Sequence, residues 1–332
     1  MPTRESRRHL LCAVCWVLVV IVVLLAVIIY LATKEPDCKD DSSSVTIETT
    51  KYGSIDGKQV YRYTFKNKNK IEVSIINYGG IVTNILVPDK NGKVEDIVLG
   101  YDSIEGFKSN GPYFGAIIGR YANRIAKGRF SIDGVNYTLA INNPPNSLHG
   151  GVKGFDKRVW KSSLKDDKLI LKYTSSDKEE GFPGEVITMV TYQLTDNNEL
   201  IIEYSATTSK KTVINLTNHA YFNLAGQGSG NIFEHKAIIK AEHYTPVDST
   251  SIPTGQLASV SGTMFDLRTA VSLGDRIPKV PGNIGFDINY SFGKTGWMKY
   301  GARLLFQQRF WRQQKHTCRP PSINLVFYPE QK

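Results

Sequence analysis

Cysteine, internal repeats and long helical periods are all scarce in this sequence. Only 4 of the 332 residues are cysteine. Cys12 and Cys15 lie inside an apolar run, so only Cys38 and Cys318 remain for the aqueous side, and no disulfide framework is implied. No unit repeats at a period of 20–50 residues, which disfavours solenoids and propellers. Beyond residue 44, no helical period lasts longer than about three turns.

Positive charge is abundant but scattered. The formal net charge is +10, yet short basic runs such as 66–70 resemble solvated turns, and no aromatic residues interleave them as a base-stacking surface requires. We therefore expect no nucleic-acid partner. No pair of carboxylates accompanies the histidine motifs described below, which argues against a glycoside hydrolase.

One long hydrophobic run is present, at the N-terminus. Residues 10–32 carry no charge and are dominated by Val, Leu and Ile. At about 1.5 Å per residue they match a hydrocarbon core of roughly 30 Å, so they predict a transmembrane helix whose partner is the lipid bilayer. A cleaved signal peptide and a buried core helix are the alternatives, but the first is usually shorter and the second has a polar face.

The flanks of this run predict its orientation. Arg4, Arg7 and Arg8 precede it, whereas acidic residues outnumber lysines after it. By the positive-inside rule, residues 1–9 form a cytoplasmic tail and the body lies on the lumenal or extracellular side. Residues 33–44 are polar and aperiodic, so they predict a flexible stalk. The expected layout continues with a folded domain at 45–303 and a tail at 304–332.

The folded domain reads as a series of strands. Alternating or β-branched runs occur at 71–75, 81–87, 169–173, 186–194 and 200–206. Asn91-Gly92 and Asp133-Gly134 are hairpin dipeptides, the second between 129–132 and 135–139. Many strands, frequent turns and no interleaved helices predict an all-β sandwich or barrel.

Polar residues suited to binding a sugar cluster in four motifs. These are Gly-Arg-Tyr-Ala-Asn-Arg-Ile at 119–125, Asn-Ser-Leu-His-Gly-Gly at 146–151, Asn-Leu-Thr-Asn-His-Ala-Tyr-Phe-Asn-Leu at 215–224, and Gly-Phe-Asp at 285–287. Guanidinium and amide groups hydrogen-bond hydroxyls, and a histidine among amides and aromatics suits acid–base work. Each motif also has a plain structural explanation: a salt-bridged loop, a core histidine or a turn aspartate.

Taken together, these motifs resemble the aldose 1-epimerase family. The resemblance extends to Gly-Phe-Asp-Lys-Arg-Val-Trp at 154–160, to Tyr-Thr-Pro-Val-Asp at 244–248 and to Gly-Thr-Met-Phe-Asp-Leu-Arg at 262–268, in family order. It spans about 45–303. It implies a large two-layer β-sandwich, an aldohexose substrate such as glucose or galactose, and no cofactor or metal.

The resemblance also implies residue roles. His219 corresponds to the general acid that protonates the ring oxygen of the hexose. Arg124, His149 and Asp287 match positions that hold the sugar, and Asn123 lies beside them in the first motif. The expected activity is interconversion of α and β anomers by ring opening, which needs an acid and a base on opposite sides of the hemiacetal.

Two departures from the family pattern leave an alternative open. Ile288 follows Asp287 where the family usually has histidine, and residues 304–332 contain no Glu-Thr-Gln motif, whose Glu is the base in relatives. The alternative to an active isomerase is a membrane-tethered sugar-binding protein or an inactive shortened form.

Overall fold

The computed structural model describes residues 44–89, 91–109, 111–283, 285–293, 299–306 and 323–327. The predicted cytoplasmic tail, the predicted transmembrane helix at 10–32 and all of the predicted stalk except Ser44 therefore lie outside the described residues. Among the helices within these ranges, none combines the length and the apolar character needed to cross a bilayer.

Strands dominate the described residues, which confirms the all-β prediction. The helical elements are short: α2 (Ile104–Lys108), α3 (Leu273–Arg276), and the 3-10 turns η1 (Ala126–Gly128), η2 (Phe155–Lys157), η3 (Glu179–Gly181), η4 (Ile277–Lys279) and η5 (Pro281–Asn283).

The first sheet is an antiparallel meander in chain order. Its strands are β1 (Thr46–Ile55), β2 (Lys58–Lys66), β3 (Glu72–Ile76), β4 (Ile81–Pro88) and β5 (Val94–Asp96). The strands predicted at 71–75 and 81–87 are confirmed as β3 and β4. The predicted hairpin at Asn91-Gly92 is confirmed as well, because it joins β4 to β5 and Gly92 has a φ of 84°.

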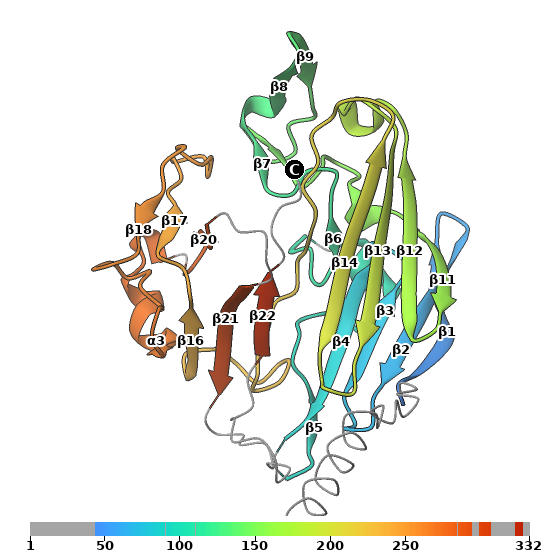
Figure 1. Cartoon of the computed structure of the whole chain (residues 1–332), viewed down its shortest axis with the longest axis vertical. Helices are drawn as coiled ribbons and strands as arrows, with labels where there is room; N and C mark the ends of the chain where they lie inside the picture. Colours follow the sequence, from blue (N-terminus) through green and yellow to red (C-terminus); the bar gives the residue numbers. More distant parts are fainter. Residues whose placement is uncertain are drawn as a thin grey trace, which may run out of the picture. The chain divides into compact units, whose positions relative to one another are not determined.

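A second antiparallel sheet lies against the first (Figure 1). It consists of β11 (Lys161–Lys165), β12 (Lys168–Ser175), β13 (Val186–Leu194) and β14 (Leu200–Thr208), so the strands predicted at 169–173, 186–194 and 200–206 are confirmed. Burial alternates along β13, as expected for a strand with one face on a core.

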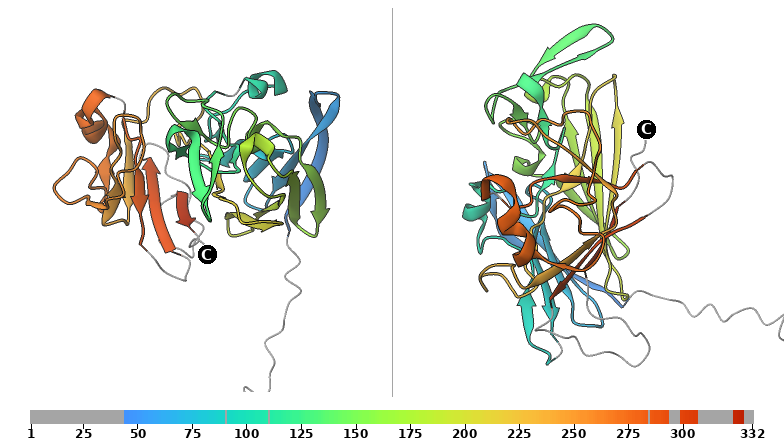
Figure 2. Two further views of the ribbon diagram at one scale, coloured as in Figure 1. Left: turned by 90° about the horizontal axis from the view of Figure 1, so that it is seen from above. Right: turned by 90° about the vertical axis from the view of Figure 1, so that its left-hand side faces the viewer.

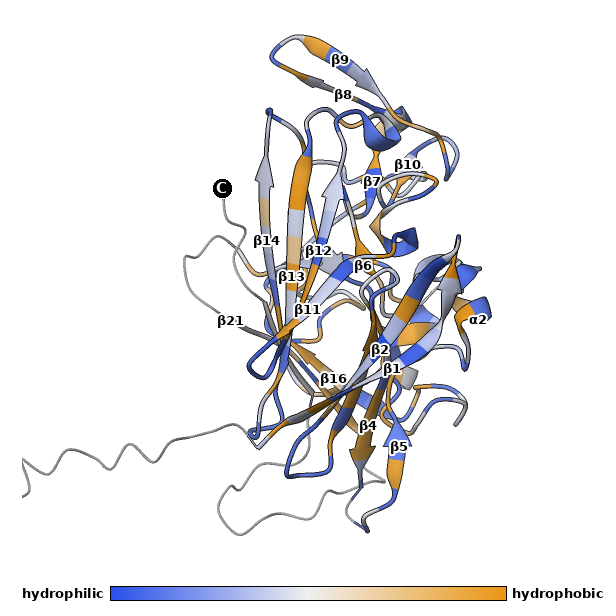
Figure 3. Cartoon of the chain, turned by 90° about the vertical axis from the view of Figure 1, so that its right-hand side faces the viewer, coloured by the Kyte–Doolittle hydropathy of each residue, from blue (hydrophilic) through white to orange (hydrophobic). Residues whose placement is uncertain are grey.

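The main core fills the space between these two sheets. It joins Phe65 and Ile75 of the first sheet to Leu171 and Val190 of the second, and it includes the fully buried Trp160. Figure 3 shows apolar positions alternating with polar ones along several of these strands. The arrangement is the two-layer sandwich that the sequence predicts.

Short strand pairs and two further sheets complete the fold (Figures 1 and 2). The pairs are β6 (Ile117–Ile118) with β15 (Thr217–Asn218), β7 (Arg124–Ile125) with β10 (Ser147–Leu148), and the predicted hairpin β8 (Arg129–Ile132) with β9 (Val135–Thr138). One sheet has the order β19 (Val271–Ser272), β16 (His235–Ile239), β21 (Lys299–Phe306), β22 (Ile323–Phe327), and the other β18 (Ala258–Ser259), β17 (His243–Thr245), β20 (Asn289–Ser291).

Strand pairing continues across the boundary expected at Arg303. That residue lies inside β21, which is hydrogen-bonded to β16 on one side and to β22 on the other. The strands of the domain thus include residues from the segment expected to be a tail.

Candidate active site

The pairing of β6 with β15 places His219 beside a tight glycine turn. The backbone N–H of His219 donates to the carbonyl of Ala116 at 2.9 Å, and the N–H of Gly115 donates to the carbonyl of His219 at 3.1 Å. Gly115 has a φ of 65°, and a Cβ there would lie 2.1 Å from the carbonyl oxygen of Val82. Glycine therefore lets this turn lie against β4 and fixes the backbone of His219.

The pairing of β7 with β10 brings Asn123 and His149 together. The N–H of His149 donates to the Asn123 carbonyl at 2.9 Å, and the N–H of Asn123 donates to Nδ1 of His149 at 3.0 Å. Both residues have left-handed backbones, with φ of 64° and 52°. Gly150 follows, and a Cβ on it would lie 2.0 Å from the Gly119 carbonyl. His149 therefore lies on a tight turn that requires glycine at position 150.

The two predicted histidines meet ring to ring. Their centroids lie 5.2 Å apart with planes at 85°, although the residues are 70 positions apart in the chain. Tyr221 lies against His219, at 5.2 Å between centroids, and 42% of its surface is exposed. An accessible aromatic beside a polar pair of rings suits the stacking of a sugar face.

His149 is held as a neutral hydrogen-bond donor. Burial, followed by the nearby charges of His219, Arg124 and Lys157, lowers the pKa of His149 to about 3. Because Nδ1 accepts the amide of Asn123, the proton of the neutral ring lies on Nε2.

Burial and nearby carboxylates have opposite effects on the pKa of His219. Burial lowers the pKa of His219 below its ordinary value, whereas the carboxylates of Asp287 and Asp156 raise it. Asp287 is exposed and lies just before β20. Its charge also adds to the effect of burial in raising the pKa of Tyr221. Asp287 therefore lies within electrostatic range of both His219 and Tyr221.

Arg124 belongs to the same group. Its Nε donates to Oδ1 of Asn143 at 3.1 Å, and its Nη1 to Oδ1 of Asn123 at 3.3 Å. Its positive charge is one of the influences that lower the pKa of His149. The structure thus brings four of the five predicted residues into contact, and the charge of the fifth, Asp287, acts on the pKa of His219.

Arg120, in the same motif, points into the protein instead. It is 2% exposed, and its Nη1 and Nη2 donate to a set of oxygens on one loop: Ser175 Oγ, and the carbonyls of Ser175, Ser176, Phe182, Pro183 and Gly184. Burial lowers the pKa of Arg120, while Glu179 and Asp177 raise it. Arg120 is therefore a structural residue that holds the 175–184 loop.

That loop carries Glu180, which holds the turn after His149. The carboxylate of Glu180 accepts the N–H of Val152 at 2.8 Å and the N–H of Lys153 at 3.2 Å. A Cβ on Gly151 would lie 2.3 Å from Oε2 of Glu180. The turn at 149–153 is thus held by Asn123 at its start and by Glu180 at its end.

Sequence reasoning missed Tyr113 and Lys157 beside the histidines, and Glu180 at the turn that follows His149. The ring of Tyr113 contacts both histidine rings, and Nζ of Lys157 lies 5.0 Å from the Tyr113 centroid. Lys157 was within reach of sequence reasoning, because it follows Gly-Phe-Asp in a family-like motif. The other two sit in stretches without a recognisable signal.

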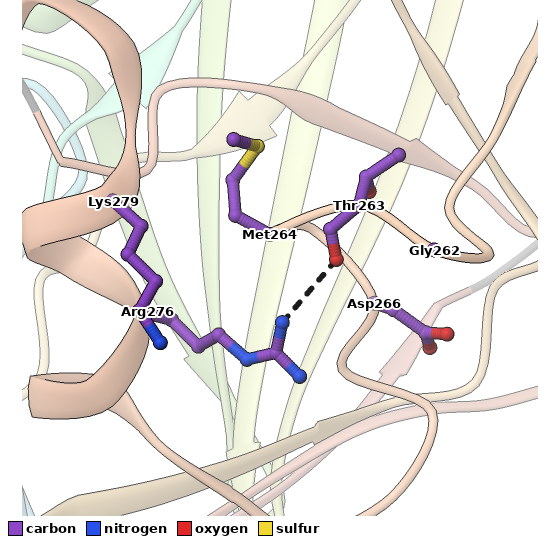
Figure 4. A pocket seen from close by; sticks show the side chains of 6 residues that line it. All are labelled: Gly262, Thr263, Met264, Asp266, Arg276 and Lys279. Atoms are coloured by element: carbon purple, nitrogen blue, oxygen red, sulfur yellow. Dashed lines mark hydrogen bonds between the residues drawn. The ribbon is translucent and has the colours of Figure 1, made fainter.

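A cavity of about 340 Å³ lies elsewhere in the fold (Figure 4). It is lined by Gly262, Thr263, Met264, Asp266, Arg276 and Lys279, and none of the predicted site residues is among them. Nη1 of Arg276 donates across it to the carbonyl of Thr263 at 3.3 Å. No cluster of three or more His, Cys, Asp or Glu suited to a metal ion occurs in the part of the chain that the structure describes.

Comparisons with known proteins agree with this geometry. The sequence profile of the family described as aldose 1-epimerase matches residues 61–316, so the match extends beyond Arg303. The galactose mutarotase of Bos taurus is 49% identical over 236 residues, which cover 71% of this chain and 68% of that protein.

Two solved structures share the fold. The galactose 1-epimerase of Lactobacillus acidophilus NCFM superposes with a TM-score of 0.69 at 27% identity, covering 79% of this chain and 77% of its own. The GalM/aldose epimerase homologue of C. elegans gives a TM-score of 0.68 at 30% identity, covering 80% and 77%. With a profile match over most of its length, relatives near 50% identity and the histidine pair in place, the chain belongs to the aldose 1-epimerase family.

Proposed function

We propose that this protein interconverts the α and β anomers of free aldohexoses, with His219 as the general acid. The observation that carries the proposal is the contact of two histidine rings, 5.2 Å apart, beside an exposed tyrosine and within the field of Asp287. Family membership supports the reaction class, and the names of the mammalian relatives support galactose as a substrate.

The chemistry needs only proton transfers. His219 gives a proton to the ring oxygen as the bond from that oxygen to C1 breaks, and a base takes the proton of the anomeric hydroxyl, so that C1 becomes an aldehyde. Rotation about C1–C2 presents the other face of the carbonyl. Reclosure returns both protons and yields the other anomer. General acid–base catalysis of this kind contributes about 10²–10⁴-fold for each group.

The neighbouring residues suit recognition of hydroxyl groups. His149 presents its Nε2–H as a fixed donor, because Nδ1 is engaged by Asn123. Arg124 offers further donors, Asn123 both a donor and an acceptor, and Asp287 acceptors for sugar hydroxyls. Tyr221 supplies an apolar ring face for the C–H groups of a hexose.

The second candidate function follows from the question of which residue accepts the proton of the anomeric hydroxyl. The resemblance assigns it to the Glu of a Glu-Thr-Gln motif, which these 332 residues do not contain. Of the described carboxylates, Asp287 and Asp156 are the ones that act on the pKa of His219. The second candidate is therefore sugar binding without turnover.

Polarimetry on the full chain tests the proposal. With α-galactose, the parent should accelerate mutarotation over buffer, and His219→Gln should lower that acceleration by about 10²-fold or more, because Gln supplies no transferable proton. Calorimetric titration with galactose gives the affinity of both proteins. A parent that binds galactose without accelerating its mutarotation would establish the second candidate. A His219→Gln variant as fast as its parent would exclude His219 as the acid.

A further inference from the structure

Tyr113 occupies a strained backbone position next to the histidines. It lies between α2 and β6 and has a φ of 61°. This conformation is unfavourable for a bulky side chain, so it persists only where the surroundings hold it. One local restraint is visible: the carbonyl of Tyr113 accepts the N–H of Ala116 at 3.1 Å, which closes the turn that leads to β6.

The strained backbone directs the tyrosine ring onto both histidines. Its centroid lies 4.7 Å from that of His149 with planes at 74°, and 5.8 Å from that of His219 with planes at 41°. Since the histidines also contact each other, the three rings form a closed triangle. The two contacts of His149 are edge-to-face and the contact between Tyr113 and His219 is tilted, so a change in one ring affects the other two.

A cation holds the tyrosine ring in turn. Nζ of Lys157 lies 5.0 Å from the Tyr113 centroid and 2.6 Å from Oδ2 of Asp156. The Asp156 side chain is only 3% exposed, so it anchors the ammonium group firmly. Burial raises the pKa of Asp156, while the charge of Lys157 lowers it.

The element that carries this ion pair is itself fixed against the His149 turn. The N–H of Phe155 donates to the Gly119 carbonyl at 2.9 Å, and a Cβ on Gly154 would lie 2.6 Å from the carbonyl oxygen of His149. The η2 turn therefore packs directly beneath the turn that bears His149. Lys157 and His149 have little freedom to move apart, and the ring of Tyr113 contacts both.

We infer that Tyr113 is a positioning residue for the histidine pair, with the Lys157–Asp156 ion pair as its support. The inference rests on the proposed function in that the histidines serve the sugar reaction. Tyr113 sets the angle between His149 and His219, and so the relative direction of the donor and the acid toward one sugar ring. It acts through its ring, not through its hydroxyl group.

Three substitutions of Tyr113 distinguish the role of its aromatic ring from the roles of its hydroxyl group and its left-handed backbone. Tyr113→Phe keeps the ring, Tyr113→Leu removes it, and Tyr113→Gly removes it while relieving the left-handed strain, so that loss of the fold does not mask the result. Tyr101→Leu is the matched control, because Tyr101 contacts Phe107 and Phe114 but neither histidine. All four are made in the full chain.

Each variant is measured in two ways: by NMR titration of the histidine rings, and by kcat and KM for galactose mutarotation. We expect Tyr113→Leu and Tyr113→Gly to move the titrations of both histidines and to lower kcat by about tenfold with a smaller change in KM, since orientation is lost more than affinity. Tyr113→Phe and the Tyr101 control should stay within about twofold of the parent.

The histidine titrations and the mutarotation kinetics test different claims. Unchanged histidine titrations in both ring-deleting variants would overturn the positioning role, whether or not the parent has activity. If these titrations move as expected while the parent shows no acceleration over buffer, the positioning role stands and the proposed isomerase function fails. A Tyr113→Phe variant that behaves like Tyr113→Leu would also overturn the inference, because the ring would then not be the essential part.

Discussion

At the scale of single residues, the two histidines have different electrostatic surroundings, although burial lowers the pKa of both. His149 receives an amide hydrogen bond at Nδ1, and its pKa is lowered to about 3 chiefly by burial. His219 has Asp287 in range, whose charge opposes the effect of burial on its pKa. Carboxylates thus act on the pKa of His219, whereas the charges that act on His149 are positive.

The carboxylate of Asp287 makes a pH prediction possible. Its charge raises the pKa of His219, so Asp287→Asn should lower that pKa further and reduce the protonated fraction at any given pH. The limb of the kcat/KM profile that falls with rising pH should then move to lower pH. Asp133→Asn, at an exposed hairpin tip, is the control. A limb that stays in place in Asp287→Asn would show that Asp287 does not act on the acid.

At the scale of elements, the site residues are positioned mainly by short turns, which side-chain hydrogen bonds hold in place. The turn at 149–153 is bound at its start by Asn123 and at its end by Glu180, whose loop is in turn held by Arg120. A carboxylate accepting two consecutive amides is a strong local restraint, because hydrogen bonds to a charged acceptor exceed neutral ones. Glu180 thus reaches the site through the backbone without facing the histidines.

Removing this carboxylate should loosen the turn selectively. In Glu180→Ala, the amides of Val152 and Lys153 lose their acceptor, and we expect faster hydrogen exchange there and roughly tenfold weaker galactose binding. Hydrogen exchange by NMR and calorimetry measure the two effects. Glu185→Ala, at an exposed position directly after the same loop, should change neither. Protection of both amides retained in Glu180→Ala would contradict the restraint.

At the scale of the whole molecule, the sandwich serves as a rigid frame for a site built from its connections. The core between β1–β5 and β11–β14 is made of fully buried side chains such as Phe65, Val190 and Trp160. The hydroxyl of Tyr192 in the second sheet donates to the carbonyl of Gly80 at 2.7 Å, next to β4 of the first. A close-packed core of this kind has low compressibility, so it limits the movement of the turns connected to it.

The N-terminal run at 10–32 stays a prediction at this scale. If it spans a bilayer, the full chain should remain in the membrane pellet after an alkaline carbonate wash. A variant with Leu18→Arg and Leu25→Arg should be released, because each arginine costs about 2.5–3.5 kcal/mol at the centre of a span. Recovery of the parent in the supernatant would reject the anchor.

Several of the longer strands and two hairpins could be predicted from the sequence, because their causes are local. Alternation placed β13 at 186–194, and Asp133-Gly134 marked the hairpin between β8 and β9, because both residues adopt a positive φ there. His149, His219, Arg124, Asn123 and Asp287 were found through family-like motifs. Tyr113 and Glu180 were not, since nothing in their neighbourhood signals a left-handed tyrosine or an amide-binding carboxylate.

The sequence by itself therefore determined the strand content, the turns and the identity of the polar motifs, all of which depend on residues a few positions apart. Only the tertiary structure decided which motifs meet. Thr217 pairs with Ile118 and Leu148 with Arg124, and these two short pairings carry the histidines to each other. Contacts across such separations depend on how two sheets pack, and packing involves the whole core at once.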